Sequence, residues 1–150
     1  MSLFFRVPEL SLAVLGFAVN AVWEFAQTPL YSDAHRGAGY LVWSRLHCAA
    51  GDALILLGAF WITAAGFGGR RWWATDRWAP LAFFLALGLG YTAYSEWYAT
   101  TVSGAWTYAP QMPVVLGIGL TPMLQWLALP PLIVKLMKFD ARRKRRVAAS

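Results

Sequence analysis

Three carboxylates stand inside apolar stretches of the sequence, and they are the residues best suited to chemistry. Glu24, Asp52 and Glu96 each lie in a long, mainly apolar block that contains no Lys or Arg. A charged side chain near the centre of a bilayer costs about 2.5–3.5 kcal/mol, so such residues usually face the interior of a helix bundle and mark a function. We therefore expect these three residues to be the catalytic groups of one site.

Carboxyl groups in this setting favour acid/base chemistry. A carboxyl group in an apolar, aromatic-lined pocket tends to keep its proton, because burial disfavours the charged form. It can then act as a general acid, and a second carboxylate can take the proton away. The rings of Trp23, Tyr91, Tyr94 and Trp97 can stabilise a developing carbocation, although anchoring and packing are alternative roles for each. The pattern favours isomerisation or cyclisation of a lipid or isoprenoid.

Other polar residues accompany the carboxylates at helical spacing. Residues 20, 23, 24 and 27 are spaced to share one helix face, and Asp52, Glu96 and Gln125 each follow a polar residue by four positions. Such stripes either line a site or form hydrogen bonds between packed helices. The residues expected to bind substrate are Asn20, Trp23, Gln27, His47, Tyr91, Tyr94, Trp97, Trp106, Tyr108 and Gln125.

The elements that position these residues are predicted to be membrane helices. The 150 residues are 59% hydrophobic and 13% charged, against about 25% charged in globular domains. This composition excludes a soluble domain. About 20 apolar residues in a helix cross a hydrocarbon core of roughly 30 Å. The chain is predicted to be all-α, a bundle of four transmembrane helices at about 10–31, 46–67, 79–99 and 113–134, with Pro130 and Pro131 ending or kinking the last one.

The cations predict how these helices are oriented. Of the 13 Lys and Arg residues, only Arg36 and Arg45 fall on the side opposite the termini. Cytoplasmic loops carry an excess of Lys and Arg, so both termini are expected in the cytoplasm, with the chain in a bacterial inner membrane. Residues 1–138 are expected to form the membrane domain. Residues 139–150 form a basic tail that meets anionic lipid head groups rather than nucleic acid. The cytoplasmic cations are Arg6, Arg70, Arg71, Arg77, Lys135, Lys138, Arg142, Arg143, Lys144, Arg145 and Arg146.

In this orientation the polar residues of all four helices fall in the outer half of the membrane. The expected site is a pocket open to the outside and closed beneath. The potential metal ligands at this depth do not show the paired spacing of known metal motifs, so no metal ligand is assigned. They are Glu24, His47, Cys48, Asp52 and Glu96. The sequence does not indicate which cofactor, if any, the protein binds. The alternatives are a non-catalytic subunit that binds a lipid, pigment, quinone or metal, a small transporter, and assembly as a homo-oligomer.

Two sets of motifs resemble known families. The pattern N-x2-W-E-x2-Q-x-P-L-Y at 20–31, with C-x3-D at 48–52 and G-x-G-L-x-P-x2-Q at 117–125, resembles a family of small bacterial four-helix membrane proteins of uncharacterised activity. This likeness covers most of the chain and implies only the fold. The five positions at 20–24 are similar to a helix motif of the integral membrane terpene cyclases of fungal meroterpenoid pathways. That likeness implies that Glu24 is the acid of a cyclisation, but those enzymes are larger and offer no counterpart for Asp52 or Glu96.

Overall fold

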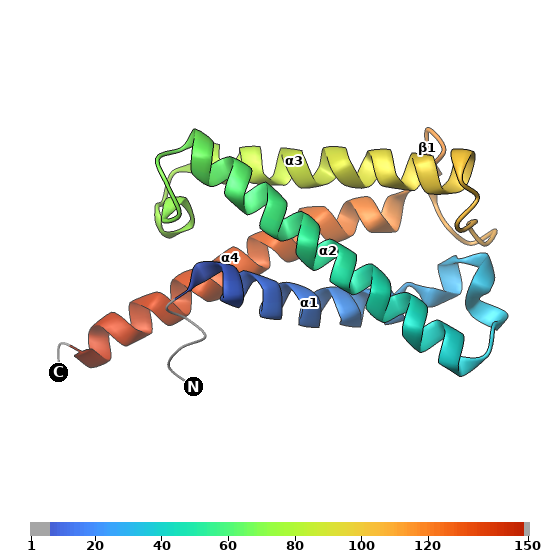
Figure 1. Ribbon diagram of the computed structural model, residues 1–150, viewed down its shortest axis with the longest axis horizontal. Helices are drawn as coiled ribbons and strands as arrows, with labels where there is room; N and C mark the ends of the chain where they lie inside the picture. Colours follow the sequence, from blue (N-terminus) through green and yellow to red (C-terminus); the bar gives the residue numbers. More distant parts are fainter. Residues whose placement is uncertain (1–6, 149–150) are drawn as a thin grey trace.

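The computed structural model describes residues 7–148, and the side chains of that range except those of residues 144, 145, 147 and 148. Four α-helices run alternately up and down and form one elongated bundle (Figure 1). Both described ends of the chain lie at the same end of this bundle. The helices are α1 (Pro8–Ala26), α2 (Ala38–Gly66), α3 (Trp78–Trp97) and α4 (Leu120–Ala148), with single turns at η1 (Thr28–Leu30), η2 (Ser32–His35), η3 (Trp72–Ala74) and η4 (Tyr98–Val102).

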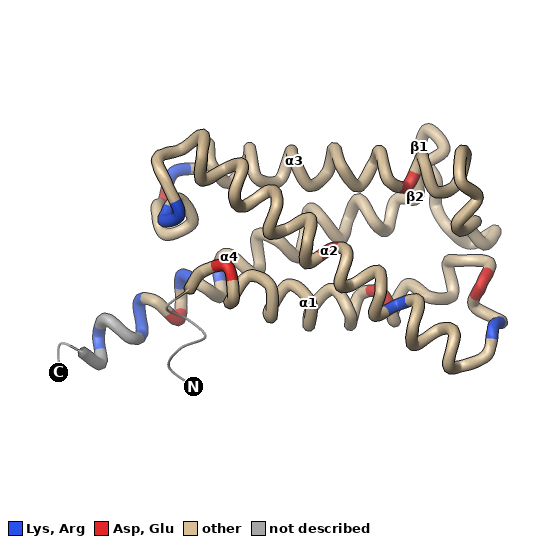
Figure 2. Tube along the Cα trace, in the orientation of Figure 1, with Lys and Arg blue, Asp and Glu red and all other residues tan. Residues whose placement is uncertain are grey.

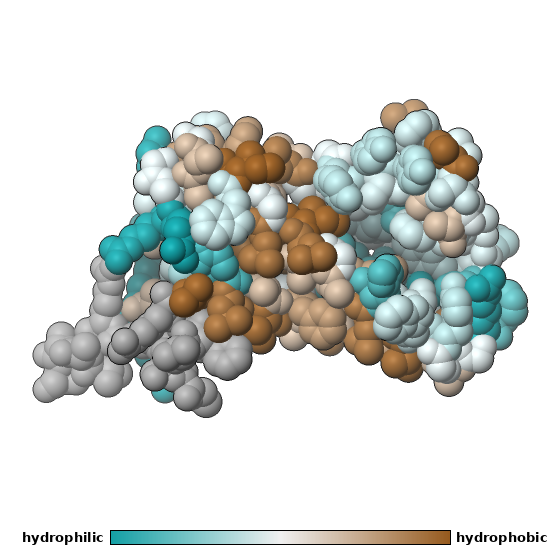
Figure 3. Space-filling model, viewed as in Figure 1, coloured by the Kyte–Doolittle hydropathy of each residue, from teal (hydrophilic) through white to brown (hydrophobic). Residues whose placement is uncertain are grey.

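Three of these helices are long and apolar enough to cross a membrane. They are α1, α2 and the Leu120–Arg143 part of α4. The fourth helix, α3, has 20 residues, but Tyr91, Tyr94 and Glu96 make its C-terminal part more polar. On the face shown in Figure 3, apolar side chains gather over the middle of the bundle and hydrophilic ones toward its two ends. The expected all-α bundle is therefore confirmed, with three helices that are long and apolar enough to cross a membrane.

Each helix buries a stripe of residues about four positions apart. On α3 the buried residues are Pro80, Phe84, Gly88, Thr92 and Glu96. Residues four apart share a helix face, so this one stripe runs from an apolar end to a polar end. The α3 stripe packs against α2 and α4, and α1 also packs against these two helices. Each stripe therefore contributes to an apolar core at one end and to polar contacts at the other.

The apolar core fills the half of the bundle near the termini. Phe60 and Phe84 are 1% and 0% exposed, and Trp72 of the connection between α2 and α3 packs against both rings. Close helix approach also requires small residues, because a Cβ on Gly88 would lie 1.9 Å from the Trp126 ring. The buried core residues are Leu12, Leu56, Ala59, Phe60, Ala64, Trp72, Phe84, Trp126, Ile133, Val134 and Met137.

Two of the predicted helix boundaries near the polar end are wrong. The first helix ends at Ala26, not near residue 31, because Pro29 has no amide hydrogen and disfavours helical geometry at the residue before it. The second helix begins at Ala38, eight residues before the predicted start. Arg45 consequently lies inside α2 and not in a loop.

The fourth predicted span also begins too early. Residues 114–119 form a small antiparallel hairpin, in which β1 (Val114–Val115) pairs with β2 (Ile118–Gly119). The turn residues Leu116 and Gly117 have φ values of 52° and 81°. Positive φ at both central residues is typical of a two-residue hairpin turn and is incompatible with a right-handed helix. The last helix therefore begins at Leu120.

The last helix does not end at its two prolines. It continues through Pro130 and Pro131 to Ala148 and includes the described part of the basic segment. Proline removes a helical hydrogen bond, but its φ suits a helix. Buried Ile133, Val134 and Met137 hold the following turns against the core. Arg6 of the predicted cytoplasmic cations lies outside the described residues, as do the side chains of Lys144 and Arg145.

Candidate functional site

Two connections meet at the end of the bundle opposite the termini. Tyr31, after α1, and Tyr108, before the hairpin, form an isolated antiparallel bridge. The Ala109 amide donates to the Leu30 carbonyl at 2.9 Å, and Ser32 bonds to Thr107. These contacts join segments that are more than 70 residues apart in the chain. They fix the ends of α1 and α3 relative to each other.

A cavity of about 340 Å³ lies between the helices at this end. Its size is at the lower end of the range of small-molecule pockets. The lining residues of α1 and α4 are buried, whereas Tyr40, His47 and Tyr91, from α2 and α3, are exposed. The ends of α2 and α3 also diverge toward this end of the bundle (Figure 1). The cavity therefore opens between α2 and α3.

Glu24 is buried at the α1 side of the cavity, with 6% of its surface exposed. Gln27 Nε2 donates to Glu24 Oε1 at 2.8 Å, and Trp23 Nε1 donates to Gln27 Oε1 at 3.2 Å. These residues are three and four positions apart, so the last turn of α1 carries the whole chain of bonds. Gln27 thereby orients the Glu24 carboxyl group.

Asp52 lies on α2 and is held from the opposite side of the bundle. Gln125 Nε2 of α4 donates to Asp52 Oδ2 at 2.8 Å and to Asn20 Oδ1 at 2.7 Å. Asn20 Nδ2 in turn donates to the Gly16 carbonyl at 2.8 Å. One buried glutamine thus connects three helices. This arrangement both stabilises the bundle and positions the Asp52 carboxyl group.

Glu96 ends the buried stripe of α3 and is bound by the connection that follows. Tyr108 Oη donates to Glu96 Oε2 at 2.5 Å, and Trp106 Nε1 lies 3.4 Å from the same oxygen. Burial and the bond to Glu96 raise the pKa of Tyr108, so its phenol keeps the proton that it donates. The Gly119 amide donates to Tyr108 Oη at 2.8 Å, and a Cβ on Gly119 would lie only 3.0 Å from the ring.

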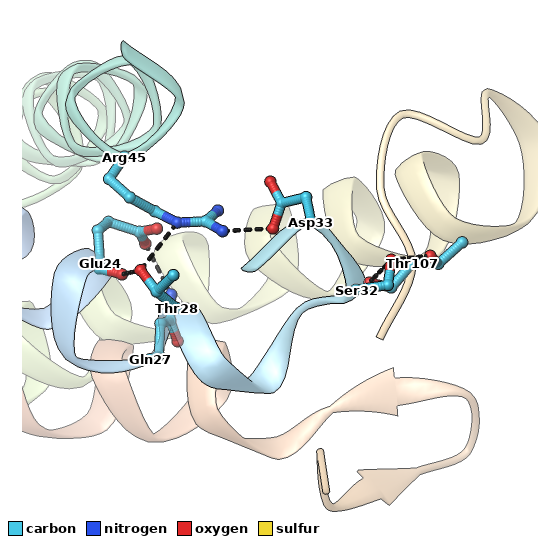
Figure 4. Close-up of polar contacts among 7 residues, drawn as sticks. All are labelled: Glu24, Gln27, Thr28, Ser32, Asp33, Arg45 and Thr107. Carbon is cyan, nitrogen blue, oxygen red and sulfur yellow. Dashed lines mark hydrogen bonds and ion pairs between the residues drawn. The ribbon is translucent and has the colours of Figure 1, made fainter. Parts of the chain in front are cut away.

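Arg45 and Asp33 form a buried ion pair that the sequence did not predict. Arg45 Nη2 lies 2.5 Å from Asp33 Oδ1, and the two side chains are 5% and 12% exposed. Arg45 Nε donates to Thr28 Oγ1 at 3.1 Å, and Thr28 Oγ1 donates to the Glu24 carbonyl at 3.0 Å (Figure 4). The expectation that Arg45 is an outer-loop cation is therefore corrected. Arg45 lies seven residues before Asp52, so the two residues share a face of α2. This spacing could have indicated that Arg45 belongs to the site, had α2 been predicted to start at Ala38.

The structure separates the predicted site residues into three groups. Glu24, Gln27, His47, Asp52, Tyr91, Glu96, Trp106 and Gln125 line the cavity. Asn20, Trp23 and Tyr108 do not line it but hydrogen-bond to residues that do. Tyr94 and Trp97 are 56% and 47% exposed and lie against each other on the outer face of α3. Lining residues that were not predicted to bind substrate include Tyr31, Asp33, Tyr40, Ser44, Arg45 and Thr92.

The lining groups do not converge as metal ligands. Within residues 7–148, no group of three or more His, Cys, Asp and Glu side chains is placed to hold a metal ion. The hydrogen-bond partners of the three carboxyl groups are instead neutral side chains: Gln27 for Glu24, Gln125 for Asp52, and Tyr108 with Trp106 for Glu96. The arrangement suits carboxyl groups that exchange protons with a molecule in the cavity.

The chain matches no protein-family model, no curated protein and no solved structure. The two resemblances drawn from its motifs therefore stay predictions. Any function must be argued from the site.

Proposed function

We propose that the chain crosses a bacterial inner membrane four times, with both termini in the cytoplasm. Lys and Arg gather toward the end of the bundle that holds the termini, and fewer lie at the other end (Figure 2). At that other end Arg36 follows η2, and Arg45 pairs with Asp33 of η2. An excess of Lys and Arg at one end is typical of the cytoplasmic side of a membrane protein. The less apolar α3 crosses beside α2 and α4, which it contacts. The cavity then lies in the outer half of the membrane, and the basic end of α4 meets anionic lipid head groups.

We propose further that this cavity performs proton-transfer chemistry on a lipid or isoprenoid. The observation that carries the proposal is that Glu24, Asp52 and Glu96, from three different helices, line one cavity. One carboxyl group protonates a carbon of a substrate double bond, and a carboxylate removes a proton from a carbon of the resulting cation. The sum is isomerisation, or cyclisation when a second double bond attacks the cation first. Positioned acid/base groups typically contribute about 10²–10⁴-fold in rate.

The roles within the site follow from its hydrogen bonds. Glu24 is the proposed acid or base, because its carboxyl group borders the cavity and is oriented by Gln27. Glu96 accepts from two groups of the third connection, which suits a carboxylate that receives a proton. Asp52 is the third carboxyl group, held by Gln125. Tyr91 and Trp106 add aromatic faces to the lining, where a cationic intermediate would be stabilised.

A second candidate function is a membrane subunit that binds a lipid without turnover. The observation that favours it is the Asn20–Gln125–Asp52 network, which joins three helices in the way that structural polar contacts do in membrane bundles. In this case the carboxyl groups would support the walls of the cavity and would exchange no proton with its occupant.

Incorporation of solvent deuterium tests the enzymatic proposal without knowledge of the substrate. The protein is incubated in liposomes of bacterial polar lipid extract in D₂O, and the lipids are then washed in H₂O and examined by mass spectrometry. Proton transfer to carbon leaves a C–D bond that washing does not remove. We expect incorporation with the wild type and its loss in Glu24→Gln, with the thermal unfolding temperature little changed.

The matched control is Glu9→Gln. Glu9 lies on the same helix at the opposite end, where it pairs with Arg70. This variant should incorporate deuterium as the wild type does. Absence of incorporation with the wild type, or equal incorporation by Glu24→Gln, would overturn the enzymatic proposal and leave the binding subunit.

A further inference from the structure

Three of the carboxyl groups in the cavity have no basic partner. Asp33 forms an ion pair with Arg45, the single Lys or Arg among the lining residues. Among the described side chains, no basic group lies within ion-pair distance of the other three, which are Glu24, Asp52 and Glu96. Glu24 and Glu96 are each 6% exposed. A buried carboxylate without an opposite charge is costly, and a cation in the cavity would supply that charge.

The lining does not suit a metal ion as this opposite charge. Within the described part of the chain, no three or more His, Cys, Asp and Glu side chains are placed to hold one. The cavity of about 340 Å³ is also much larger than a metal ion, and its size falls in the range of sites for small organic molecules. The partner that fits both the charge and the space is an organic cation.

Asp52 is the most accessible of the three carboxyl groups to such a ligand. It is partly exposed, whereas Glu24 and Glu96 are buried. Gln125 Nε2 donates to Asp52 Oδ2, and no hydrogen bond from a described residue reaches Asp52 Oδ1. An ionised carboxylate offers about four acceptor positions. Asp52 can therefore meet a cation while it keeps its bond to Gln125.

The walls of the cavity suit an apolar group attached to the charge. Tyr91 and Trp106 belong to the same lining as the carboxyl groups. The faces of aromatic rings attract organic cations, and the attraction is stronger when water is excluded. Ile55 and Trp126 add apolar surface to the lining. The cavity opens between α2 and α3, so a lipophilic cation could enter it from the surrounding lipid.

We infer that the cavity binds a lipophilic organic ammonium ion, whose charge is met by the carboxylates of Asp52 and Glu96 and whose apolar part lies against the aromatic lining. The inference goes beyond the proposed proton transfer, because this ligand arrives with its charge and need not react. It rests on the proposed function only for the membrane as the source of the ligand. An uncharged ligand would leave the carboxylates without an opposite charge, and an anion would add repulsion.

Three probes of similar size separate charge from shape. Binding of tritiated phenyltrimethylammonium to the purified full-length protein in phosphatidylcholine nanodiscs is measured at constant salt, with empty nanodiscs as background. Unlabelled phenyltrimethylammonium, tert-butylbenzene and benzenesulfonate then compete with it. tert-Butylbenzene has the shape of the cation without its charge, and benzenesulfonate has the opposite charge. We expect the cation to compete at least about tenfold better than either. Equal competition by either one, or no saturable binding of the cation, would overturn the inference.

A charge-removing variant in the cavity locates the bound cation. Asp52→Asn removes the charge but leaves an amide oxygen that can accept the bond from Gln125. We expect it to weaken binding of phenyltrimethylammonium at least about tenfold. The matched control is Asp76→Asn, which changes the net charge equally but outside the cavity lining. The Asp76 side chain is 80% exposed and pairs with Lys138 and Arg142. This control should bind as the wild type does.

A second variant keeps the test decisive if Asp52→Asn folds poorly. Glu96→Gln also removes a charge, and its amide oxygen can still accept the bond from Tyr108. We expect a similar loss of affinity, with Glu9→Gln as the control because Glu9 pairs with Arg70 outside the lining. Unchanged affinity in both cavity variants would overturn the inference. Equal losses in the controls would also overturn it, because they would indicate attraction by net charge alone.

The outcomes distinguish this inference from the enzymatic proposal. Cation binding that depends on Asp52, with no deuterium incorporated into any lipid, would support the ligand class and overturn the enzyme. Deuterium incorporation that is lost in Glu24→Gln, with no binding of phenyltrimethylammonium, would retain the enzyme and overturn the ligand class.

Discussion

The two halves of the bundle are built from the same helix faces but are packed differently. Along the buried stripe of α3, Phe84 is 0% exposed and touches Trp72, whereas Glu96 at the other end of the stripe borders the cavity. Apolar side chains fill space in any orientation that avoids a clash. Polar side chains must meet partners at fixed distances and angles, and the space they leave between them stays open. The cavity is therefore a consequence of polar residues on otherwise ordinary packing stripes.

The connections at the two ends differ in the same way. The connection between α2 and α3 inserts Trp72 into the core, so it closes that end. The connections at the opposite end bond to each other through Tyr31, Ser32, Thr107 and Tyr108, and they supply Asp33 and Trp106 to the cavity lining. One end of the bundle is thus closed by packed side chains. At the other end the two bonded connections form a rim around the cavity, which consists of residues 30–33 and 106–109.

The largest effect is expected from breaking the closed half. Phe60→Ala removes a ring that is 1% exposed and packs against Trp72, so we expect a loss of about 3–5 kcal/mol in the free energy of unfolding. Unfolding is measured by thermal or denaturant titration in detergent. The adjacent Trp61 is 49% exposed, and Trp61→Ala should cost far less. Equal losses in the two variants would mean that this half is not closely packed.

In the open half, the largest effect is expected from its ion pair. Asp33→Asn leaves the Arg45 guanidinium buried without its carboxylate partner. We therefore expect the free energy of unfolding to fall by about 3 kcal/mol. The double variant Asp33→Asn/Arg45→Gln removes the unpaired charge and should recover part of that stability. If the double variant is no more stable than Asp33→Asn, the ion pair is not what holds this end together.

Gly88 lies where the two halves meet, and its substitution tests their boundary. An added Cβ would lie 1.9 Å from Trp126, which borders the cavity. We expect Gly88→Ala to lower the free energy of unfolding by about 1–3 kcal/mol, because the Trp126 ring must move. The same movement should change ligand binding in the cavity. Gly90→Ala, two residues along α3 in open space, should be neutral or slightly stabilising. A neutral Gly88→Ala would show that Trp126 has room to shift.

Loss of a single rim contact should have a smaller effect. Tyr108→Phe removes the hydrogen bond to Glu96 and the acceptor of the Gly119 amide. We expect a loss of about 1 kcal/mol at neutral pH, since each such bond has a modest net value. The same measurement on Tyr94→Phe is the control, because Tyr94 is 56% exposed outside the cavity. A larger loss in Tyr94→Phe would contradict the assignment of the rim contact.

The smallest effect concerns alkaline pH. Burial, followed by the Glu96 hydrogen bond, raises the pKa of Tyr108 in the folded state. The unfolded phenol ionises near pH 10, so the stabilisation is complete below that pH and is lost as the pH rises above it. Stability measured between pH 9 and pH 11 should therefore fall less steeply in Tyr108→Phe than in the wild type. An unchanged slope would show that Tyr108 has the same pKa in the folded and unfolded states.

The helices were largely predictable, because their evidence is local. Apolar blocks and polar residues four positions apart are properties of neighbouring residues, so they predicted four helices and the polar end of each. The boundaries were less predictable, since Arg45 interrupts the apolar composition without interrupting α2. The hairpin at 114–119 was missed because its short strands have the same apolar residues as a helix.

The sequence alone determined the helical, membrane-like character of the chain and the set of carboxyl groups available to it, because composition and periodicity act over a few residues. Only the tertiary structure decided which groups meet. Gln125 joins Asn20 and Asp52 across 105 and 73 residues. Arg45 pairs with Asp33, and the Thr92 hydroxyl has no hydrogen-bond partner among the described residues. Such pairings depend on how four helix faces pack together, and the packing of each face is settled only by all the others.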